Sequence, residues 1–296
     1  GHAHPDGVAA IREAAGRYLQ ISPDFGKEGQ TGLAEMIDAL GPVNGPAMSF
    51  FANSGTEAVE AALKLARYVT GRPRFIGFLG GFHGRSMGSL AFTASRPTQQ
   101  RGFFPTMPGV THVPFPDSYR PLLAGADQGL AVLGYIEKLF QSNVPADEVA
   151  AVLVEPILGE GGYLVPPEGF LAGLRELCDR HGILLVFDEI QTGIGRTGRM
   201  FAWQHWGVRP DIITLAKGLA SGMPLGLAVA RRDLMERWPA GAHANTYGGN
   251  PLACAAASAT LKLVADQYTA NASQAGERLA TGLRALAGEF ACIGDV

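Results

Sequence analysis

The stretch Ile183-Leu184-Leu185-Val186-Phe187-Asp188 is an apolar run that ends on a carboxylate. A second run, Ile212-Ile213-Thr214-Leu215-Ala216, is followed directly by Lys217. Strands that are apolar throughout are typical of parallel sheets covered on both faces. Ligands of open α/β sheets bind in the crevice beyond the carboxyl ends of such strands. The two runs therefore predict a parallel sheet in which Asp188 and Lys217 face one pocket.

Strand-like and helix-like runs alternate along the chain and are separated by Pro, Gly and Asn. This alternation predicts an α/β protein in three layers, a mostly parallel sheet flanked by helices. The expected strands are 48–52, 75–79, 149–155, 183–188, 212–215 and 225–230. The expected helices are 8–20, 31–40, 57–69, 128–141, 167–181, 251–264 and 275–287. Residues 96–125, which include several prolines, are expected to form a long structured loop over the sheet.

The composition indicates a soluble globular enzyme. The 296 residues are 47% hydrophobic and 17% charged, which allows a large core. A net charge of -3 without any basic run gives no electrostatic footprint for nucleic acid or for an anionic membrane surface. We expect neither a membrane-spanning helix nor a signal peptide, and therefore a cytoplasmic location.

The cysteines and the N-terminal histidines do not predict a metal site. Cys178, Cys254 and Cys292 are far apart and lack a C-x-x-C spacing, so we expect reduced thiols that are mostly buried. His2 and His4 lie just before a helical run, and we expect them to belong to the entry of that helix.

Asp188 and Lys217 are suited to the chemistry of a pyridine aldehyde cofactor. A lysine held among apolar neighbours is deprotonated more easily, because its ammonium loses solvation, and it can then form a Schiff base with an aldehyde. A carboxylate against a pyridine nitrogen keeps that nitrogen protonated, so that the ring can accept electrons. Taken singly, an aspartate at a strand end is more often a cap, and a lysine near a loop is more often a solvated charge.

The segment Asn53-Ser54-Gly55-Thr56-Glu57 lies between an expected strand and an expected helix. The start of a helix offers unpaired N–H groups and the positive end of the helix dipole, and Gly55 lets the backbone approach an anion closely. The segment therefore predicts a phosphate site. A Ser or Thr followed by Glu is also a common helix cap, and both interpretations can hold together.

The segment Gly81-Phe82-His83-Gly84-Arg85 follows the expected strand 75–79. The ring of Phe82 could stack on a flat pyridine, and Arg85 could hold a carboxylate through two parallel hydrogen bonds. The alternative is a glycine-rich turn whose phenylalanine packs into the core.

Four further polar residues are candidates for the same site. Glu155 ends an expected strand and Glu160 follows in the next loop, so they could act as an acid/base pair or serve in ion pairing and loop hydrogen bonding. Gln191 could donate to a phenolic oxygen of the cofactor, or be a plain loop residue. Thr246 precedes a helix and could be only its cap.

The segment Gly193-Ile194-Gly195-Arg196-Thr197-Gly198 matches the dinucleotide-binding pattern G-x-G-x-x-G. That fingerprint should turn directly from strand to helix, whereas Asp188 to Thr192 intervene, and no helical period follows. We therefore do not expect a dinucleotide site.

Several motifs together carry a family resemblance. They are Ser54-Gly55-Thr56, Gly81-Phe82-His83-Gly84-Arg85, Glu155-Pro156-Ile157-Leu158-Gly159-Glu160-Gly161-Gly162, Asp188-Glu189-Ile190-Gln191-Thr192-Gly193, Lys217-Gly218 and Thr246-Tyr247-Gly248-Gly249-Asn250-Pro251. Over nearly its whole length the chain resembles the class III aminotransferases, which are fold type I pyridoxal-phosphate enzymes. It looks most like the 4-aminobutyrate and acetylornithine aminotransferases.

The resemblance implies a role for each candidate. Lys217 and Asp188 would be catalytic, and the cofactor-binding residues would be Ser54, Gly55, Thr56, Phe82, His83, Asp188, Gln191, Lys217 and Thr246. The substrate-binding residues would be Arg85, Glu155 and Glu160. Thr246 would reach the phosphate held by the neighbouring subunit, which implies a homodimer. The counterpart of Glu160 pairs with an arginine near the C-terminus in the family, and that arginine would lie beyond Val296.

The resemblance also implies three segments. They are a shortened N-terminal segment over 1–30, a large pyridoxal-phosphate-binding domain over 31–262, and the start of a small α+β domain over 263–296. The final residues 293–296 are expected to begin a strand.

The expected activity is the transfer of an amino group from an ω-amino acid resembling 4-aminobutyrate to a 2-oxo acid such as 2-oxoglutarate. Pyridoxal 5'-phosphate is the expected cofactor, and no metal is expected. A racemase or epimerase of the same family is the alternative. A non-catalytic fragment that binds the cofactor is a second alternative.

Overall fold

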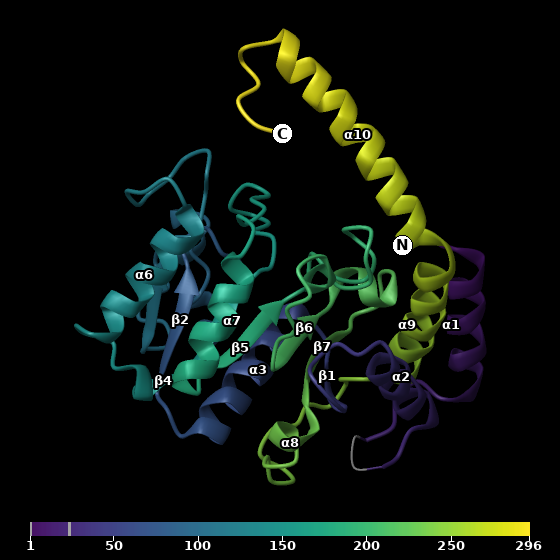
Figure 1. Cartoon of the computed structure of the whole chain (residues 1–296). Coiled ribbons are helices and arrows are strands. Elements are labelled where there is room, and N and C mark those ends of the chain that lie inside the picture. Colours follow the sequence, from purple (N-terminus) through teal and green to yellow (C-terminus); the bar gives the residue numbers. More distant parts are fainter. Residues whose placement is uncertain (1, 23–24) are drawn as a thin grey trace.

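The computed structural model describes residues 2–22 and 25–296 (Figure 1). Seven strands form one sheet in the order β1-β7-β6-β5-β4-β2-β3. The strands are β1 (Ala47–Ala52), β2 (Arg74–Phe78), β3 (Val110–Val113), β4 (Val149–Val154), β5 (Leu184–Asp188), β6 (Ile212–Leu215) and β7 (Gly226–Arg231). Strand β7 is antiparallel to β1 and β6, and the other neighbouring pairs are parallel. The expected mostly parallel sheet is confirmed.

The helices lie close to the expected ranges. The longer ones are α1 (Pro5–Arg17), α2 (Glu28–Ala39), α3 (Gly55–Thr70), α6 (Gln128–Phe140), α7 (Phe170–His181), α9 (Pro251–Leu263) and α10 (Thr269–Glu289). The short ones are α4 (Met87–Leu90), α5 (Pro97–Gln100), α8 (Arg232–Met235) and the 3-10 turns η1 (Ala146–Glu148), η2 (Ala202–His205) and η3 (Lys217–Ala220). A π-helical turn, η4 (Val264–Tyr268), joins α9 to α10.

The sheet separates two hydrophobic cores, which makes the fold three-layered. Leu184 and Val186 of β5 belong to the core that contains the buried face of α3. Leu185 and Phe187 of the same strand belong to the core that contains the buried residues of α6 and α7. Because side chains alternate along a strand, a strand that is apolar at every position packs against helices on both faces. Figure 1 shows α6 and α7 on one side of this sheet.

Local signals in the sequence set the ends of α3. Ser54 is its N-cap, and the Ser54 hydroxyl accepts a hydrogen bond from the backbone N–H of Glu57 at 3.3 Å. Gly71 ends the helix with φ of 69°, a left-handed conformation that glycine adopts without a side-chain clash. The cap and the glycine place the start of α3 at the carboxyl end of the sheet, next to the predicted pocket.

Two expectations about secondary structure were wrong. Residues 96–125 are not only a loop, because they contain α5 and the edge strand β3, which pairs in parallel with β2. Strand β3 has only four residues and lies between turns, so it is too short to show a hydrophobic period. Residues 293–296 form no strand, since no neighbouring strand in the described chain offers them hydrogen-bond partners.

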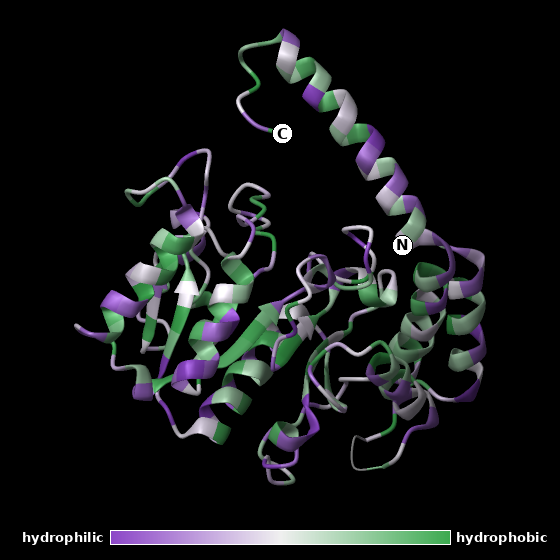
Figure 2. Cartoon of the chain, in the orientation of Figure 1, coloured by the Kyte–Doolittle hydropathy of each residue, from purple (hydrophilic) through white to green (hydrophobic). Residues whose placement is uncertain are grey.

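Helix α10 projects away from the rest of the chain (Figure 1). None of its residues is buried. Leu279, Leu283 and Leu286 lie at the spacing of one helical face and are exposed, and Figure 2 shows apolar segments along this helix. Among residues 2–22 and 25–296, no helix combines the length and the apolar character that a membrane span requires. The boundary at 262/263 between the expected domains stays a prediction.

Candidate active site

A cavity of about 460 Å³ opens at the carboxyl ends of β5 and β6. It is lined by Asn53, Ser54, Gly55, Thr56, Phe82, His83, Gly84, Arg85, Glu155, Glu160, Asp188, Ile190, Gln191, Ala216, Lys217, Gly222, Met223, Pro224 and Leu225. Every predicted site residue except Thr246 lines this cavity. Its volume falls in the range of small-molecule sites, about 300–1,000 Å³.

The neighbouring strands β5 and β6 bring Asp188 and Lys217 together. Asp188 is the last residue of β5 and pairs in register with Thr214 of β6, three residues before Lys217. Parallel neighbours end at the same edge of a sheet, so both side chains reach one cavity. The expectation of a shared pocket is confirmed.

The carboxylate of Asp188 is buried and held at both oxygens. Its Oδ2 lies 2.7 Å from Nδ1 of His83, and its Oδ1 accepts hydrogen bonds from the Ile190 N–H and the Thr214 hydroxyl, each at 3.1 Å. Burial opposes a positive charge on His83, but the hydrogen bond and the charge of Asp188 raise the pKa of His83 on balance. His83 thus orients the Asp188 carboxylate. The Nε2 atom of His83 is buried and has no hydrogen-bond partner among the described residues.

Glu155 supports two loops of the site. Its two oxygens accept hydrogen bonds from the backbone N–H of Phe82 at 2.9 Å and of Gly159 at 3.0 Å. Burial raises the pKa of Glu155, and the charge of His83 opposes that rise. Of the roles considered for this residue, loop hydrogen bonding is the one that its contacts display. Both oxygens already have backbone donors, so a direct contact of Glu155 with substrate stays a prediction.

The start of α3 lies in the cavity and has the features of an anion site. Ser54, Gly55 and Thr56 line the cavity where the first N–H groups of a helix lack partners within the helix. The hydroxyl of Thr56 is fixed by those of Ser86 and Ser89, at 2.7 and 2.6 Å. The predicted cap is present as well, so the cap and the anion site coexist.

Phe82 and Arg85 extend from the turn after β2 into the cavity. Phe82 is half-buried and Arg85 is exposed. The guanidinium carbon of Arg85 lies 5.8 Å from the centroid of the Phe82 ring, within range of a cation–π contact. Arg85 forms no ion pair with any described residue. The cavity therefore contains an aromatic face and an unpaired cation next to each other.

Lys217 differs from the expectation of a lysine held among apolar neighbours, because its side chain is exposed. It begins the turn η3 after β6 and lines the cavity. Its backbone φ is 39°. This left-handed conformation costs a non-glycine residue of the order of 1–3 kcal/mol, and such strain concentrates at functional sites.

The remaining candidate residues differ in burial and in whether they line the cavity. Gln191 is half-buried and Glu160 is exposed, and both line the cavity. Thr246 is exposed and lies outside the cavity, and its backbone carbonyl accepts a hydrogen bond from the side chain of Gln20. The sequence suggested that Thr246 serves a neighbouring subunit, and its position outside the pocket of its own chain leaves that prediction open.

The structure adds two groups that the sequence argument missed. Thr214 donates to Asp188, and a threonine inside an apolar strand was the available signal. Glu189 is fully buried next to Asp188 and accepts hydrogen bonds from the backbone N–H of Ala202 at 2.6 Å and of Trp203 at 2.9 Å. Burial raises the pKa of Glu189 to about 7. Nothing in the sequence near Glu189 identifies η2 as its partner.

The segment Gly193–Gly198 that matches the dinucleotide pattern forms turns after β5 and no helix begins within it. The strand-to-helix turn that a pyrophosphate requires is therefore missing there, as expected.

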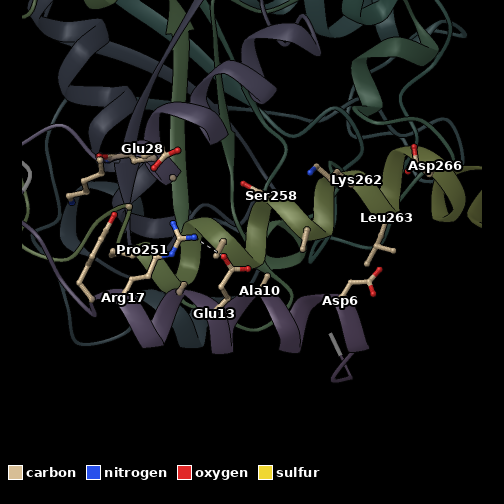
Figure 3. Close-up of a pocket in the computed structure, with 18 of the residues that line it drawn as sticks. Asp6, Ala10, Glu13, Arg17, Glu28, Pro251, Ser258, Lys262, Leu263 and Asp266 are labelled. Carbon is tan, nitrogen blue, oxygen red and sulfur yellow. Dashed lines mark hydrogen bonds and ion pairs between the residues drawn. The ribbon is translucent and has the colours of Figure 1, made fainter.

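Another cavity, of about 620 Å³, lies between α1, α9 and the start of α2 (Figure 3). Its charged residues are mixed in sign, and Arg17 and Glu13 pair with each other at 2.8 Å. Among the described residues that line it, no carboxylate is buried as that of Asp188 is.

Comparison with known proteins gives one consistent family. The family model described as "Aminotransferase class-III" matches residues 1–296. The chain is 43% identical over 280 residues to an acetylornithine aminotransferase of Methanopyrus kandleri. The match covers 95% of this chain and 66% of that protein. It is 43% identical over 297 residues to a putrescine aminotransferase of Pectobacterium atrosepticum, covering 98% of this chain and 60% of that protein. The chain thus spans about two thirds of the length of these relatives.

Solved structures with the same fold include an amine transaminase from an uncultivated Pseudomonas species in its PLP-bound form. The TM-score is 0.91 at 31% identity, over 98% of this chain and 70% of that one. A taurine:2-oxoglutarate aminotransferase from Bifidobacterium kashiwanohense, in complex with PLP and glutamate, gives a TM-score of 0.89 at 32% identity. The match covers 98% of this chain and 66% of that one.

Proposed function

The chain belongs to the class III aminotransferases, and we propose that it binds pyridoxal phosphate and transfers an amino group from an ω-amino acid resembling 4-aminobutyrate to a 2-oxo acid such as 2-oxoglutarate. One observation carries the proposal. Asp188, at the end of β5, and Lys217, in the turn after the adjacent strand β6, line the same cavity as the start of α3.

The residues of the cavity match the chemical groups of the cofactor one by one. The start of α3, at Ser54 to Thr56, suits a phosphate. The Asp188 carboxylate, oriented by His83, suits a protonated ring nitrogen. The Lys217 amine suits an aldehyde. An anion site, a carboxylate and an amine in one cavity fit pyridoxal phosphate better than a nucleotide, which offers no aldehyde for Lys217.

The cofactor, when bound, supplies a carbonyl that takes up the amino group and a ring that accepts electrons from the substrate carbon. Asp188 would keep the ring nitrogen protonated, and its buried ion pair with His83 fixes the carboxylate in that position. Lys217 would hold the cofactor covalently and then, once released, carry the proton that leaves the substrate carbon. The ring of Phe82 would cover one face of the cofactor.

Substrate choice is the finer part of the proposal. Arg85 is an unpaired cation at the cavity and suits the carboxylate of an ω-amino acid. The curated relatives are named for acetylornithine and for putrescine, so their names favour no single amine donor. We further propose a homodimer in which Thr246 contributes to the site of the partner, and a location in the cytoplasm. The exposure of Thr246 at the surface of its own chain supports the first of these.

The test uses the complete gene product loaded with pyridoxal phosphate. Borohydride reduction should attach the cofactor irreversibly to the peptide that contains Lys217, as read by mass spectrometry. Lys217→Ala should lose this attachment, and its transamination rate should fall by at least about 10³-fold, because the group that moves the proton is gone. Lys262→Ala, which changes an exposed lysine on α9, is the matched control and should keep both. A Lys217→Ala protein with unchanged activity would refute the proposal.

The same preparation distinguishes the alternatives. Deuterium uptake at the α-carbon of an amino acid without formation of an oxo acid would indicate a racemase. Cofactor binding without reaction with any amine donor would indicate a non-catalytic protein.

A further inference from the structure

Three hydroxyl groups join the start of α3 to the segment that follows Arg85, and we refer to Thr56, Ser86 and Ser89 as the hydroxyl cluster. The Oγ1 atom of Thr56 lies 2.7 Å from Oγ of Ser86 and 2.6 Å from Oγ of Ser89. Thr56 lines the cavity that contains Asp188, whereas the two serines are not among its lining residues. The cluster therefore supports the wall of this cavity at the end predicted to hold the phosphate.

Glu60, one turn further along α3, is the acceptor for the segment 86–89. Its Oε1 atom accepts hydrogen bonds from the Ser86 hydroxyl, from the backbone N–H of Gly88 at 2.9 Å and from that of Ser89 at 3.1 Å. These two N–H groups belong to the first turn of α4, where the backbone donors have no partner within the helix. A single carboxylate oxygen of α3 thus holds α4 and the serine that precedes it.

The contact with Glu60 determines the direction of the hydrogen bonds in the hydroxyl cluster. An ionised carboxylate can only accept, so the single hydroxyl hydrogen of Ser86 is donated to Glu60. The Thr56 hydroxyl must then donate to Ser86, and the Ser89 hydroxyl must donate to Thr56. The hydroxyl hydrogen of Thr56 is therefore used within the cluster, and the donor that Thr56 can offer to an anion is its backbone N–H.

The segment that carries Arg85 packs tightly against α3. A Cβ on Gly88 would overlap the carboxylate of Glu60, and a Cβ on Gly84 would overlap the hydroxyl cluster. Gly84 and Arg85 line the cavity and directly precede the first serine of the cluster. A displacement of the Glu60 side chain would therefore be transmitted to the wall of the cavity.

We propose that Glu60 is a positioning residue of the phosphate site. It holds the hydroxyl cluster against the first turn of α3 and keeps the hydroxyl hydrogen of Thr56 within that cluster. The phosphate is then bound by the backbone N–H groups of Gly55 and Thr56, which have no partner within the helix. The inference rests on the proposed function, because it requires pyridoxal phosphate with its phosphate at the start of α3.

The test compares two ligands that differ only in the phosphate. The complete gene product, freed of cofactor, is titrated with pyridoxal phosphate and with pyridoxal, and the ratio of the two dissociation constants measures the contribution of the phosphate. Glu60→Ala should reduce the preference for pyridoxal phosphate by about tenfold, because the N–H groups at the start of α3 lose their alignment. Its affinity for pyridoxal should change little.

Gly88→Ala tests the same contact without altering Glu60. The added methyl group must displace the Glu60 carboxylate, so the preference for pyridoxal phosphate should fall as it does in Glu60→Ala. An unchanged preference in Gly88→Ala would contradict the role of Glu60.

Glu60→Gln separates the hydrogen bonds from the negative charge. The N–H groups of Gly88 and Ser89 both point at one oxygen, so the amide must place its carbonyl oxygen there and can keep all three hydrogen bonds. We therefore expect the preference of wild type in Glu60→Gln. A loss as large as that of Glu60→Ala would overturn the inference.

Asp38→Ala is the matched control. Asp38 also accepts a hydrogen bond from a backbone N–H, that of Ala47 at 2.7 Å, and it does not line the cavity. Asp38→Ala should leave the preference for pyridoxal phosphate unchanged, and a loss equal to that of Glu60→Ala would contradict a specific role of Glu60.

The failures of the two proposals give different results. Equal weakening of both ligands in Glu60→Ala would make Glu60 a purely structural residue and overturn the inference alone. A wild-type protein that transfers amino groups but binds pyridoxal as tightly as pyridoxal phosphate would overturn the phosphate site and leave the transfer intact. Absence of binding of either ligand would overturn both proposals.

Discussion

The carboxyl edge of the sheet and helix α10 have opposite relations to the rest of the chain. At the sheet edge, Asp188 and Glu189 are buried and every one of their carboxylate oxygens has a partner within the chain. On α10 no residue is buried, and an apolar face with Leu283 at its centre is exposed. The candidate site is therefore stabilised by contacts within this chain, whereas α10 contributes little to that stability. Because stability is not uniform across a structure, substitutions of the same type should cost very different amounts in the two regions.

Truncation of a leucine should show the largest difference. Leu185 of β5 has no exposed surface, so Leu185→Ala should lower the free energy of unfolding by about 2–5 kcal/mol through lost burial and the cavity that remains. Leu283→Ala removes a side chain that is 39% exposed and should cost less than about 0.5 kcal/mol. Urea unfolding of both variants measures the two costs. Comparable losses of stability in the two variants would show that α10 packs against another surface in solution. They would contradict the proposed difference between the sheet edge and α10.

The pH dependence of stability should identify the buried Glu189. Burial raises the pKa of Glu189 from 4.5 to about 7, so between these values the folded chain binds a proton that the unfolded chain has released. Stability from this group is therefore fully present below about pH 4.5 and is lost as pH rises to about 7, by roughly 3 kcal/mol. We expect no pH-dependent loss of stability of this size from α10, because none of its residues is buried.

Glu189→Gln removes this titration. The variant should be less stable overall, since its amide can accept only one of the two backbone hydrogen bonds from η2. Its free energy of unfolding should nevertheless fall less steeply than that of wild type between pH 5 and 7, as urea unfolding at a series of pH values would show. Parallel curves for the two proteins would mean that Glu189 does not titrate in this range.

Glycine-to-alanine substitutions should give the smallest difference in stability between the sheet edge and α10. A Cβ on Gly226 of β7 would overlap the backbone oxygen of Ser54, so Gly226→Ala must displace the start of α3 and should cost about 1–3 kcal/mol. A Cβ on Gly282 of α10 meets nothing within 4 Å, and Gly282→Ala should stabilise the helix by up to about 1 kcal/mol. Thermal unfolding compares the two. Cofactor binding should weaken only in Gly226→Ala, and unchanged binding would argue against a phosphate site at Ser54.

Much of the architecture was predictable because it depends on local patterns. The strands that are apolar at every position, such as β5, required cover on both faces, and the two cores confirm it. Ser54 followed by Gly55 predicted the start of α3 at the sheet edge, and the structure has it there. By contrast, β3 was missed because four residues carry too little periodicity.

The apolar runs of the sequence specify which residues end the central strands, and therefore that Asp188 and Lys217 line one cavity, because parallel neighbours finish at one edge of a sheet. The partners of these residues depend on the three-dimensional packing of the chain. His83 and Asp188 are 105 positions apart and lie 2.7 Å from each other. Likewise, Lys217 is exposed although it lines the cavity that contains Asp188, and Thr246 lies outside that cavity. Such proximity depends on how loops from distant strands pack over the sheet, and no local pattern of polar and apolar residues encodes that packing.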